Sequence, residues 1–536
     1  MCFRRSWHAL AMRRLIALAG GCAWSIAALS AVSPQTPPQA TPFDLVITGA
    51  RVVDGTGNPW RRADVAVRGD RIVAVENAGR LAGQPAAETI DARDRVLAPG
   101  YIDVHSHAVP SLGHETLRKA EALLAQGVTT IVGNPDGGGP TDLAAQATTL
   151  RQNGIGVNVA LLIGHGSVRS AVLGGVDRQP TDADLDRMRA IVRQAVADGA
   201  VGLSSGLFYT PGRYAKTEEV IALAKAAGGV YTSHIRDEGN YDYGVVNSVD
   251  EVIRVAEGAG VRGVVSHMKA LGPDSWGQSK TLAEHIDAAR ARGVEVFADQ
   301  YPYDASSTSL AAAVMPGQSA VMAKEAMDGS ESRRDLLAVV KENIRRRGGP
   351  KSIVIASGRG APGRAGQSLE QIAQAAGTTP EEAATRIVID GGASIVSFNM
   401  SDEDIDRIMR QPWTMASSDG GLSLPGQSLP HPRGNGAFAR RIARYVRDRG
   451  VLTLEEAVRT ATSLPAAVFG FADRGVIRAG AVADLILFDP AAVQDRATYA
   501  NPHEIAAGMS LVVVNGRVAW RDGAGTGVLA GQVLKR

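Results

Sequence analysis

Short apolar runs alternate with longer stretches of mixed apolar and charged residues between about residues 99 and 479. Strands buried on both faces are continuous apolar runs, whereas helices at a protein surface mix the two residue types. The alternation therefore predicts an α/β fold with β/α units around a parallel sheet. Eight strands are expected, the first directly after Pro99 and the others at residues 129–134, 157–163, 201–205, 229–234, 263–267, 295–299 and 414–419.

The segment 99–479 is longer than eight β/α units require. A (β/α)8 TIM-type barrel typically takes about 250 residues. The excess predicts an insertion near residues 312–392, where helical, charged and Gly-rich stretches precede the last strand. Residues 352–356 are a further strand candidate inside it, so the count of eight strands is a best fit to the pattern.

Both ends of the remaining chain have a β-rich pattern. Residues 43–54, 63–67 and 72–75 are strand-like and are separated by Gly-containing turns, and residues 480–489 and 511–518 have the same character. We therefore expect residues 43–98 and 480–536 to form one small β-sandwich domain beside the barrel.

The first 33 residues have the pattern of a secretory signal peptide. Arginines precede a mostly apolar run at residues 15–32, which ends in small residues. Cleavage after Ser33 would leave a Pro- and Gln-rich linker at residues 34–42 and an exported protein, periplasmic or secreted, without a stable membrane span. The alternative interpretation is an uncleaved membrane anchor, because the apolar run is near the lower length limit for a spanning helix.

Composition narrows the class of protein. The 536 residues are 45% hydrophobic and 21% charged, as in an ordinary soluble globular enzyme, and the formal net charge is only +2. Net charge therefore gives no support to a nucleic-acid partner. Cys2 and Cys22 are the only cysteines, so cleavage of the signal peptide leaves no thiolate as metal ligand or nucleophile. The oligomeric state stays open.

Histidines and an aspartate stand at the ends of four predicted strands. His105 and His107 are two residues apart, and because strand side chains alternate, both imidazoles lie on one side. Taken alone, this pair is also interpretable as two hydrogen-bonded histidines. His234, His267 and Asp419 end three other strands, and catalytic groups of such barrels lie at the carboxyl ends of the strands. Nitrogen and carboxylate ligands with an open position predict catalytic zinc.

From about Phe43 onward the sequence resembles the amidohydrolase superfamily and, within it, the D-aminoacylase (N-acyl-D-amino-acid deacylase) family. The motifs that carry the resemblance lie at residues 98–107, 202–212, 233–238, 266–269, 299–303 and 431–433. Residues 474–477, Gly480 and residues 483–485 are similar to a pattern shared widely across the superfamily. Together these motifs are specific, whereas the His-x-His pair alone is not.

The resemblance implies an enzyme with one or two zinc ions. It assigns His105 and His107 to one metal position and His234 and His267 to the other. It also makes Asp419 the general acid/base that moves a proton from the attacking water to the leaving nitrogen. The alternative interpretation of Asp419 is a purely structural metal ligand.

One position departs from the family pattern. Family members often have a cysteine directly after the Gly-Asn that closes the strand at residues 127–134, whereas this chain has Pro135 there and Asp136 one residue later. Asp136 is the candidate replacement, because a carboxylate can bind zinc where a thiolate did. The alternative interpretation is an aspartate that only stabilises an Asp-Gly turn.

Substrate recognition is expected from residues that match the family positions for binding the substrate carboxylate, which are Lys269, Tyr301, Ser307 and Arg433. A lone lysine or arginine near a strand end is more commonly a solvated charge. His165 and Arg169 also follow a strand, and for them a role in the site and a local hydrogen-bonding role are both open.

The resemblance implies hydrolysis of a linear amide bond in a small molecule, either an N-acyl-D-amino acid or a short peptide that contains a D-amino acid. A cyclic amidase of the dihydroorotase or hydantoinase kind is the alternative enzyme and would need a bridging carboxylated lysine. A non-catalytic binding protein on the same barrel is the third hypothesis. The sequence retains every predicted metal histidine and Asp419, whose loss would have favoured that third hypothesis.

Overall fold

A computed structural model describes residues 42–426 and 428–535. The predicted signal peptide at residues 1–33 and all but the last residue of the predicted linker lie outside the described residues. Among the residues that are described, no helix combines the length and the apolar character needed to cross a membrane.

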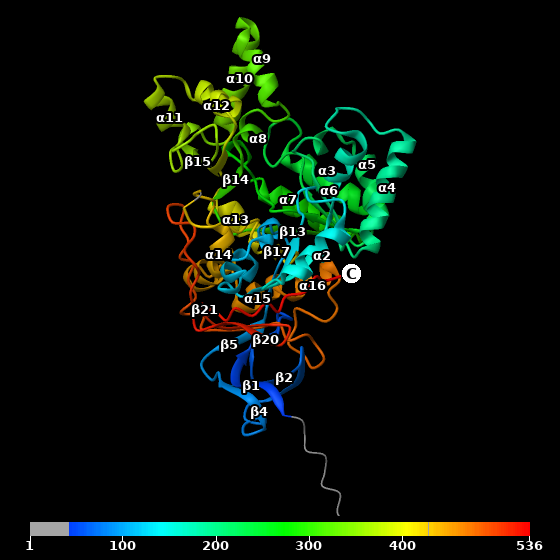
Figure 1. Ribbon diagram of the computed structural model, residues 1–536, viewed down its shortest axis with the longest axis vertical. Helices are drawn as coiled ribbons and strands as arrows, with labels where there is room; N and C mark the ends of the chain where they lie inside the picture. Colours follow the sequence, from blue (N-terminus) through cyan, green and yellow to red (C-terminus); the bar gives the residue numbers. More distant parts are fainter. Residues whose placement is uncertain (1–41, 427, 536) are drawn as a thin grey trace, which may run out of the picture. The chain divides into compact units, whose positions relative to one another are not determined.

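Strands from both ends of the chain form one nine-stranded sheet (Figure 1). Its members are β1 (Phe43–Val52), β2 (Arg61–Arg68), β3 (Arg71–Asn77), β4 (Ala86–Asp91), β5 (Val96–Pro99), β18 (Leu485–Phe488), β19 (Met509–Val514), β20 (Arg517–Arg521) and β21 (Ala524–Gly525). The two ends meet where Leu97 of β5 pairs with Leu487 of β18. Ile47 and Val65 from the N-terminal strands share a buried core with Val513 from the C-terminal strands.

Eight parallel strand positions form the barrel, in the order in which they follow along the chain. They are β6 (Tyr101–Asp103), β7 (Val128–Gly133), β8 with β9 (Asn158–Leu161 and Ile163–Gly164), β10 (Gly202–Gly206), β11 (Val230–His234), β12 (Arg262–Val265), β13 (Val296–Gln300) and β17 (Thr414–Ala416). A bridge between Ser106 and Gly420 joins the first strand to the last. Every predicted strand has a counterpart, and the predicted fold class is confirmed.

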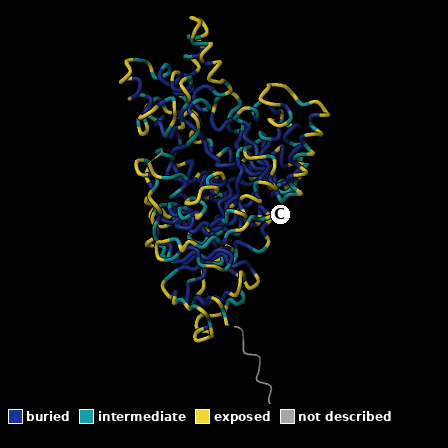
Figure 2. The backbone as a smooth tube through the Cα atoms, in the orientation of Figure 1, coloured by how far each residue is buried: buried dark blue, intermediate teal, exposed yellow. Residues whose placement is uncertain are grey.

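Helices cover the barrel strands. They are α1 (Glu121–Leu124), α2 (Leu143–Asn153), α3 (His165–Leu173), α4 (Asp182–Ala197), α5 (Thr217–Ala227), α6 (Val245–Ala259), α7 (Ser279–Ala291), α13 (Asp402–Met409), α14 (Arg433–Arg440), a π-helix (Arg441–Asp448), α15 (Leu454–Ala461) and α16 (Ser463–Phe469). In α6, Val245, Val249, Val252 and Ala256 recur every three or four residues, and all four are buried. Figure 2 shows the buried backbone in the interior and exposed segments around it.

The insertion after β13 is a subdomain with its own hydrophobic core. It comprises β14 (Ala305–Ser309), α8 (Leu310–Val314), α9 (Ala320–Asp328), α10 (Ser330–Arg346), β15 (Ile353–Ser357), α11 (Leu369–Ala376), α12 (Pro380–Ile389) and β16 (Ser394–Phe398). Its sheet has the order β14-β16-β15. The insertion therefore begins before and ends after the predicted range of 312–392. Its start differs because β14 is a run of serines and threonine that lacks the apolar signal of a strand, and its end differs because β16 pairs with β14.

Candidate active site

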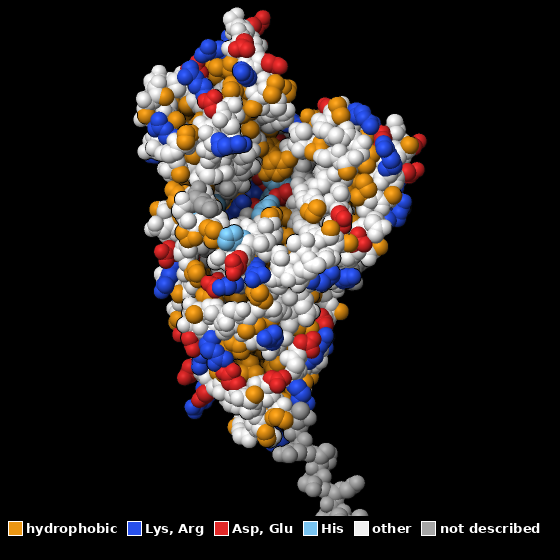
Figure 3. Space-filling view, in the orientation of Figure 1, with side chains coloured by type: hydrophobic (Ala, Val, Ile, Leu, Met, Phe, Trp, Pro, Cys, Tyr) orange, Lys and Arg blue, Asp and Glu red, His pale blue; other side chains and the backbone are white. Residues whose placement is uncertain are grey.

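A cavity of about 380 Å³ lies at the carboxyl ends of the barrel strands. Figure 3 shows a hollow on this face, with histidine, acidic and basic side chains at its bottom. The barrel contributes most of the lining, and β14 adds Ser306, Ser307 and Thr308 from the insertion. The predicted residues His107, Asp136, His234, His267, Lys269, Tyr301, Ser307, Asp419 and Arg433 all line this one cavity.

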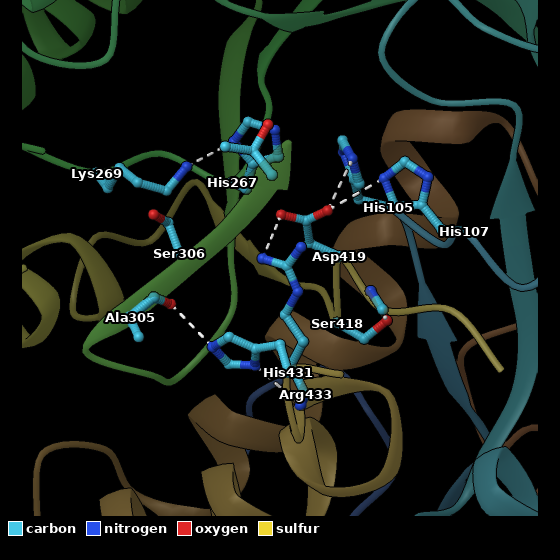
Figure 4. A network of polar contacts seen from close by, with 12 residues as sticks. His105, His107, His267, Lys269, Ala305, Ser306, Ser418, Asp419, His431 and Arg433 are labelled. Atoms are coloured by element: carbon cyan, nitrogen blue, oxygen red, sulfur yellow. Dashed lines mark hydrogen bonds and ion pairs between the residues drawn. The ribbon is translucent and has the colours of Figure 1, made fainter. Parts of the chain in front are cut away.

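The first group of candidate metal ligands is His105, His107, Asp136 and Asp419. His105 and His107 follow β6 and point to the same side, as the strand alternation predicts. Their Nε2 atoms lie 3.3 and 3.2 Å from the two carboxylate oxygens of Asp136. The same nitrogens lie 3.6 and 3.2 Å from Oδ1 of Asp419 (Figure 4).

The second group is Asp136, His234 and His267. Nδ1 of His234 lies 2.9 Å from Nε2 of His267. These nitrogens are 3.9 and 3.6 Å from Oδ1 of Asp136, the oxygen that also faces His105. Asp136 is therefore common to both groups and occupies the position of a bridging ligand.

The distances within the first group, and the distance between His267 and Asp136 in the second, fit zinc. A tetrahedral ion with bonds of about 2.0–2.2 Å separates its ligand atoms by about 3.3–3.6 Å. Most of the separations between nitrogens and oxygens are 3.2–3.6 Å, as given above. In addition, His105 Nε2 and Asp136 Oδ1 are buried atoms that have no hydrogen-bond partner among the described residues. Such atoms are rare in proteins unless a further ligand satisfies them.

The electrostatics of the cluster also favour a cation. Burial lowers the pKa of His234 to about 4 and keeps this imidazole neutral, which is the form that binds a metal. Burial and the positive charge of Lys269 also lower the pKa of His267. The carboxylates of Asp419, Glu238 and Asp136 outweigh both effects and raise this pKa to about 10. Without a metal ion, His267 is therefore protonated, and its positive charge compensates these carboxylates. A divalent cation bound at this point would compensate the same carboxylates.

Strained backbone positions accompany the ligands. Asp136, His267 and Asp419 have φ angles of 55°, 35° and 49°, in the left-handed region that residues other than glycine seldom adopt. Strain of this kind persists only where the surrounding structure enforces it, and it gathers at functional sites. The left-handed turn at Asp136 aims the carboxylate into the cavity, which explains how an aspartate one residue later in the chain can reach the histidines.

A comparison with protein families gives the decisive match. The model of a family described as "Amidohydrolase family" matches residues 88–519, which cover the barrel, the insertion and most of the C-terminal strands. The chain belongs to the amidohydrolase family. The resemblance predicted from the motifs is confirmed.

Among known proteins, this amidohydrolase is similar to D-aminoacylase from Alcaligenes xylosoxydans xylosoxydans, with 36% identity over 92% of this chain and 98% of that one. It is also similar to the crystal structure of N-acyl-D-glutamate deacylase from Bordetella bronchiseptica, solved with zinc and a phosphonate that mimics the tetrahedral intermediate. That match has a TM-score of 0.78 and 35% identity, and covers 92% of this chain and 100% of that one. A D-aminoacylase structure described as having a binuclear metal centre matches with the same values.

Asp419 of this amidohydrolase has two kinds of partner. Oδ1 faces His105 and His107, and Oδ2 forms an ion pair with Nη1 of Arg433 at 2.7 Å (Figure 4). Burial raises the pKa of Asp419, but the positive charges of Arg433 and His267 outweigh burial and hold this pKa well below the usual range. The side chain is therefore an ionised carboxylate that can accept a proton.

Two buried aspartates behind the ligands of the amidohydrolase hold them in place, and the sequence did not predict either role. Asp103 accepts hydrogen bonds from the backbone N–H and the hydroxyl of Ser418, at 2.9 and 2.5 Å, next to Asp419. Burial raises the pKa of Asp103 to about 6. Asp299 accepts a 2.9 Å hydrogen bond from the backbone N–H of His267. Both aspartates lie inside the quoted motifs, but only the fold directs them toward the ligands.

The predicted substrate-binding residues differ in their surroundings. Lys269 forms an ion pair with Glu238, a cavity residue that sequence reasoning did not single out, and lies 2.8 Å from Nδ1 of His267. Arg433 lies over the ring of Tyr301, with 4.7 Å between the guanidinium carbon and the ring centre. The hydroxyl of Tyr301 is buried and has no hydrogen-bond partner among the described residues. Tyr301 is thus a free donor in the wall of the cavity.

Of three further residues, His431 supports the amidohydrolase site, whereas His165 and Arg169 lie outside it. His431 accepts from the backbone N–H of Arg433 through Nδ1 and contacts the carbonyl of Ala305 through Nε2, so it ties Arg433 to the insertion (Figure 4). His165 and Arg169 instead both bind Glu219. They do not line the cavity, which favours the local hydrogen-bonding role.

Proposed function

We propose that this protein is a zinc-dependent amidohydrolase that removes the acyl group from N-acyl-D-amino acids. The observation that carries the proposal is the convergence of two histidine groups on Asp136, in a cavity that also contains an ionised Asp419 and the Arg433–Tyr301 pair. The D configuration is supported by the relatives, which include a D-aminoacylase and an N-acyl-D-glutamate deacylase.

The residues that would hold zinc are His105, His107, His234 and His267, with Asp136 between the two groups. Bound there, zinc supplies a Lewis acid that polarises the amide carbonyl and lowers the pKa of water. A cyclic amidase would need a bridging carboxylated lysine, whereas the group shared by the two sets of histidines in this chain is the carboxylate of Asp136. This arrangement therefore supports the linear-amide hypothesis.

Asp419 is the proposed proton carrier. Because it is ionised, it can take a proton from the attacking water and give it to the leaving nitrogen as the carbon–nitrogen bond breaks. The products are the carboxylate of the former acyl group and the free amino acid. Arg433 holds Oδ2 of Asp419 and leaves Oδ1 facing the histidines, so the carboxylate cannot rotate away from the reacting atoms.

Arg433, Tyr301 and Ser307 are the proposed partners of the substrate α-carboxylate. A guanidinium and a hydroxyl donor in a buried wall make strong, directional hydrogen bonds to a carboxylate. Lys269 lies beside the same wall, with 5.4 Å between its ammonium nitrogen and the centre of the Tyr301 ring, but its charge is paired with Glu238.

The proposed activity is tested by measuring hydrolysis of N-acetyl-D- and N-acetyl-L-amino acids by the zinc-loaded protein. We expect the D series to be hydrolysed and the L series to react more slowly by roughly 100-fold or more. Chelation should abolish the activity and added zinc should restore it. Hydrolysis of hydantoins in place of linear amides would favour the cyclic-amidase alternative, and no amide hydrolysis at full zinc loading would refute both.

We further propose that residues 1–33 are a secretory signal and that the mature enzyme is periplasmic or secreted, supported by the arginine, apolar and small-residue pattern. Expression of the full chain in a Gram-negative host should give an exported protein that begins at Pro34. An intact N-terminus in the membrane fraction would favour the anchor, and an intact N-terminus in the cytoplasm would contradict export.

A further inference from the structure

Arg347 is a buried cation in the cavity that the proposed mechanism does not use. It directly follows α10 of the insertion, lines the cavity and is only 2% exposed. The cavity contains two other long cationic side chains, Lys269 and Arg433.

The carboxylates of the cavity are already engaged. Lys269 pairs with Glu238, Arg433 pairs with Asp419, and Asp136 faces the histidines. Arg347 forms no ion pair with any described carboxylate. Among the long cationic side chains in the described lining of the cavity, Arg347 is therefore the one without a matching carboxylate.

The contacts of Arg347 are neutral. Its Nε donates a 2.6 Å hydrogen bond to the hydroxyl of Tyr241. When the amide of Asn399 is oriented to satisfy its neighbours, its oxygen accepts from Nη1 of Arg347 at 3.3 Å. A buried guanidinium without a counter-charge is costly, and a carboxylate from a ligand would remove that cost.

Arg347 forms no hydrogen bond or ion pair with the candidate metal ligands in the part of the chain that the structure describes. Aromatic rings lead outward from the ligand His234 to Phe208 and then to Tyr241, with 5.8 and 5.6 Å between successive ring centres. The guanidinium carbon of Arg347 lies 5.8 Å from the centre of the Tyr241 ring. Arg433, in contrast, contacts Asp419 directly. The described lining of the cavity thus has one cationic anchor that contacts a candidate metal ligand, Arg433, and one that contacts none of them, Arg347.

We propose that Arg347 binds a second carboxylate of the substrate, so that the preferred substrates are N-acyl-D-amino acids with two carboxylates. This inference rests on the proposed function. The α-carboxylate occupies the anchor near Asp419, and the second carboxylate reaches Arg347. That second carboxylate is carried either by the amino-acid side chain or by the acyl group, and both sources present the same chemistry to the guanidinium.

The test compares kcat/KM for dicarboxylates and their uncharged isosteres. One arm uses N-acetyl-D-glutamate against N-acetyl-D-glutamine, and the other uses N-succinyl-D-leucine against its terminal amide. In one of the two arms the wild-type enzyme should prefer the dicarboxylate by about 10- to 100-fold, the range expected for a hydrogen-bonded charge. The arm that shows the preference identifies the source of the second carboxylate.

Substitution of Arg347 then assigns the preference to this side chain. Arg347→Met should remove the preference, mainly by raising KM for the dicarboxylate, and leave kcat/KM for the neutral isostere within about threefold. Arg347→Lys keeps the charge and should retain part of the preference. Arg334→Met is the matched control, because Arg334 is on α10 with a side chain that is 73% exposed. Thermal unfolding of each variant checks that it is folded.

Two results would overturn the inference and leave the proposed function intact. The first is equal or better hydrolysis of the neutral isosteres by the wild-type enzyme in both arms. The second is an equal loss on all substrates in Arg347→Met, since the arginine would then serve the α-carboxylate or the fold. If Arg347→Met does not fold, the wild-type comparison and Arg347→Lys decide. Absence of hydrolysis for every N-acyl amino acid would refute the proposed function as well.

Discussion

We expect the Asp419→Asn variant to keep its bound metal and to lose most of its turnover. Asparagine has nearly the same shape as aspartate and retains an oxygen that can face His105 and His107. It cannot accept the proton of the attacking water, and general acid/base groups typically contribute roughly 100- to 10,000-fold to rate. The measurements are kcat on an N-acetyl-D-amino acid and zinc content of the same preparation.

A matched control separates this effect from the loss of a charge in general. Asp177→Asn makes the same chemical change at an exposed position outside the cavity, and should leave kcat and zinc content unchanged. Turnover near the wild-type level in Asp419→Asn would remove the proton-transfer role. Parallel loss of zinc and turnover would instead favour the alternative in which Asp419 is a structural metal ligand.

The second large effect is expected at Asp136. Because its carboxylate faces both histidine groups, Asp136→Asn should weaken zinc binding at both metal positions and reduce activity in proportion. Loss of a residue that only orients a ligand typically costs about 10- to 100-fold in metal affinity, and loss of a charged ligand should cost more. The measurements are zinc affinity by competition with a chelator and activity against added zinc.

Substitution by asparagine should leave the backbone conformation at residue 136 unchanged. Asp136 has a φ of 55°, and asparagine is one of the residues that best tolerate the left-handed region. Asp136→Cys is the informative partner, since a thiolate is also a zinc ligand and should retain more metal than the amide. Full zinc content and activity in Asp136→Asn would mean that Asp136 is only a turn residue.

The fold and the grouping of the candidate metal ligands were largely predictable from the sequence. The barrel strands are short apolar runs buried on both faces, and this local signal holds whatever the neighbouring segments are. His105, His107, His234 and His267 follow such runs, and parallel strands bring their carboxyl ends to one mouth. A one-dimensional pattern therefore implied that these distant residues gather in three dimensions.

For Asp136 and Lys269, the sequence pattern identified the residue but not its contacts in the folded protein. The pattern identified Asp136 as a candidate ligand and could not separate it from a turn residue, because the answer depends on a left-handed φ angle. It identified Lys269 as a cation near a strand end, but not that Glu238 neutralises it. Asp103, behind Asp419, gave no signal at all beyond its place in a motif.

By itself, the sequence determined the α/β class, the order of the barrel strands and the residue types at their ends. It could do so because buried strands and helices each require a characteristic spacing of apolar residues along the chain. The tertiary structure alone decided which charges in the cavity are matched. Arg347 lies in an insertion, and its exclusion from ion pairs depends on how that insertion packs over the barrel. Periodicity records which face of an element is buried, but not which side chain from a distant element lies opposite it.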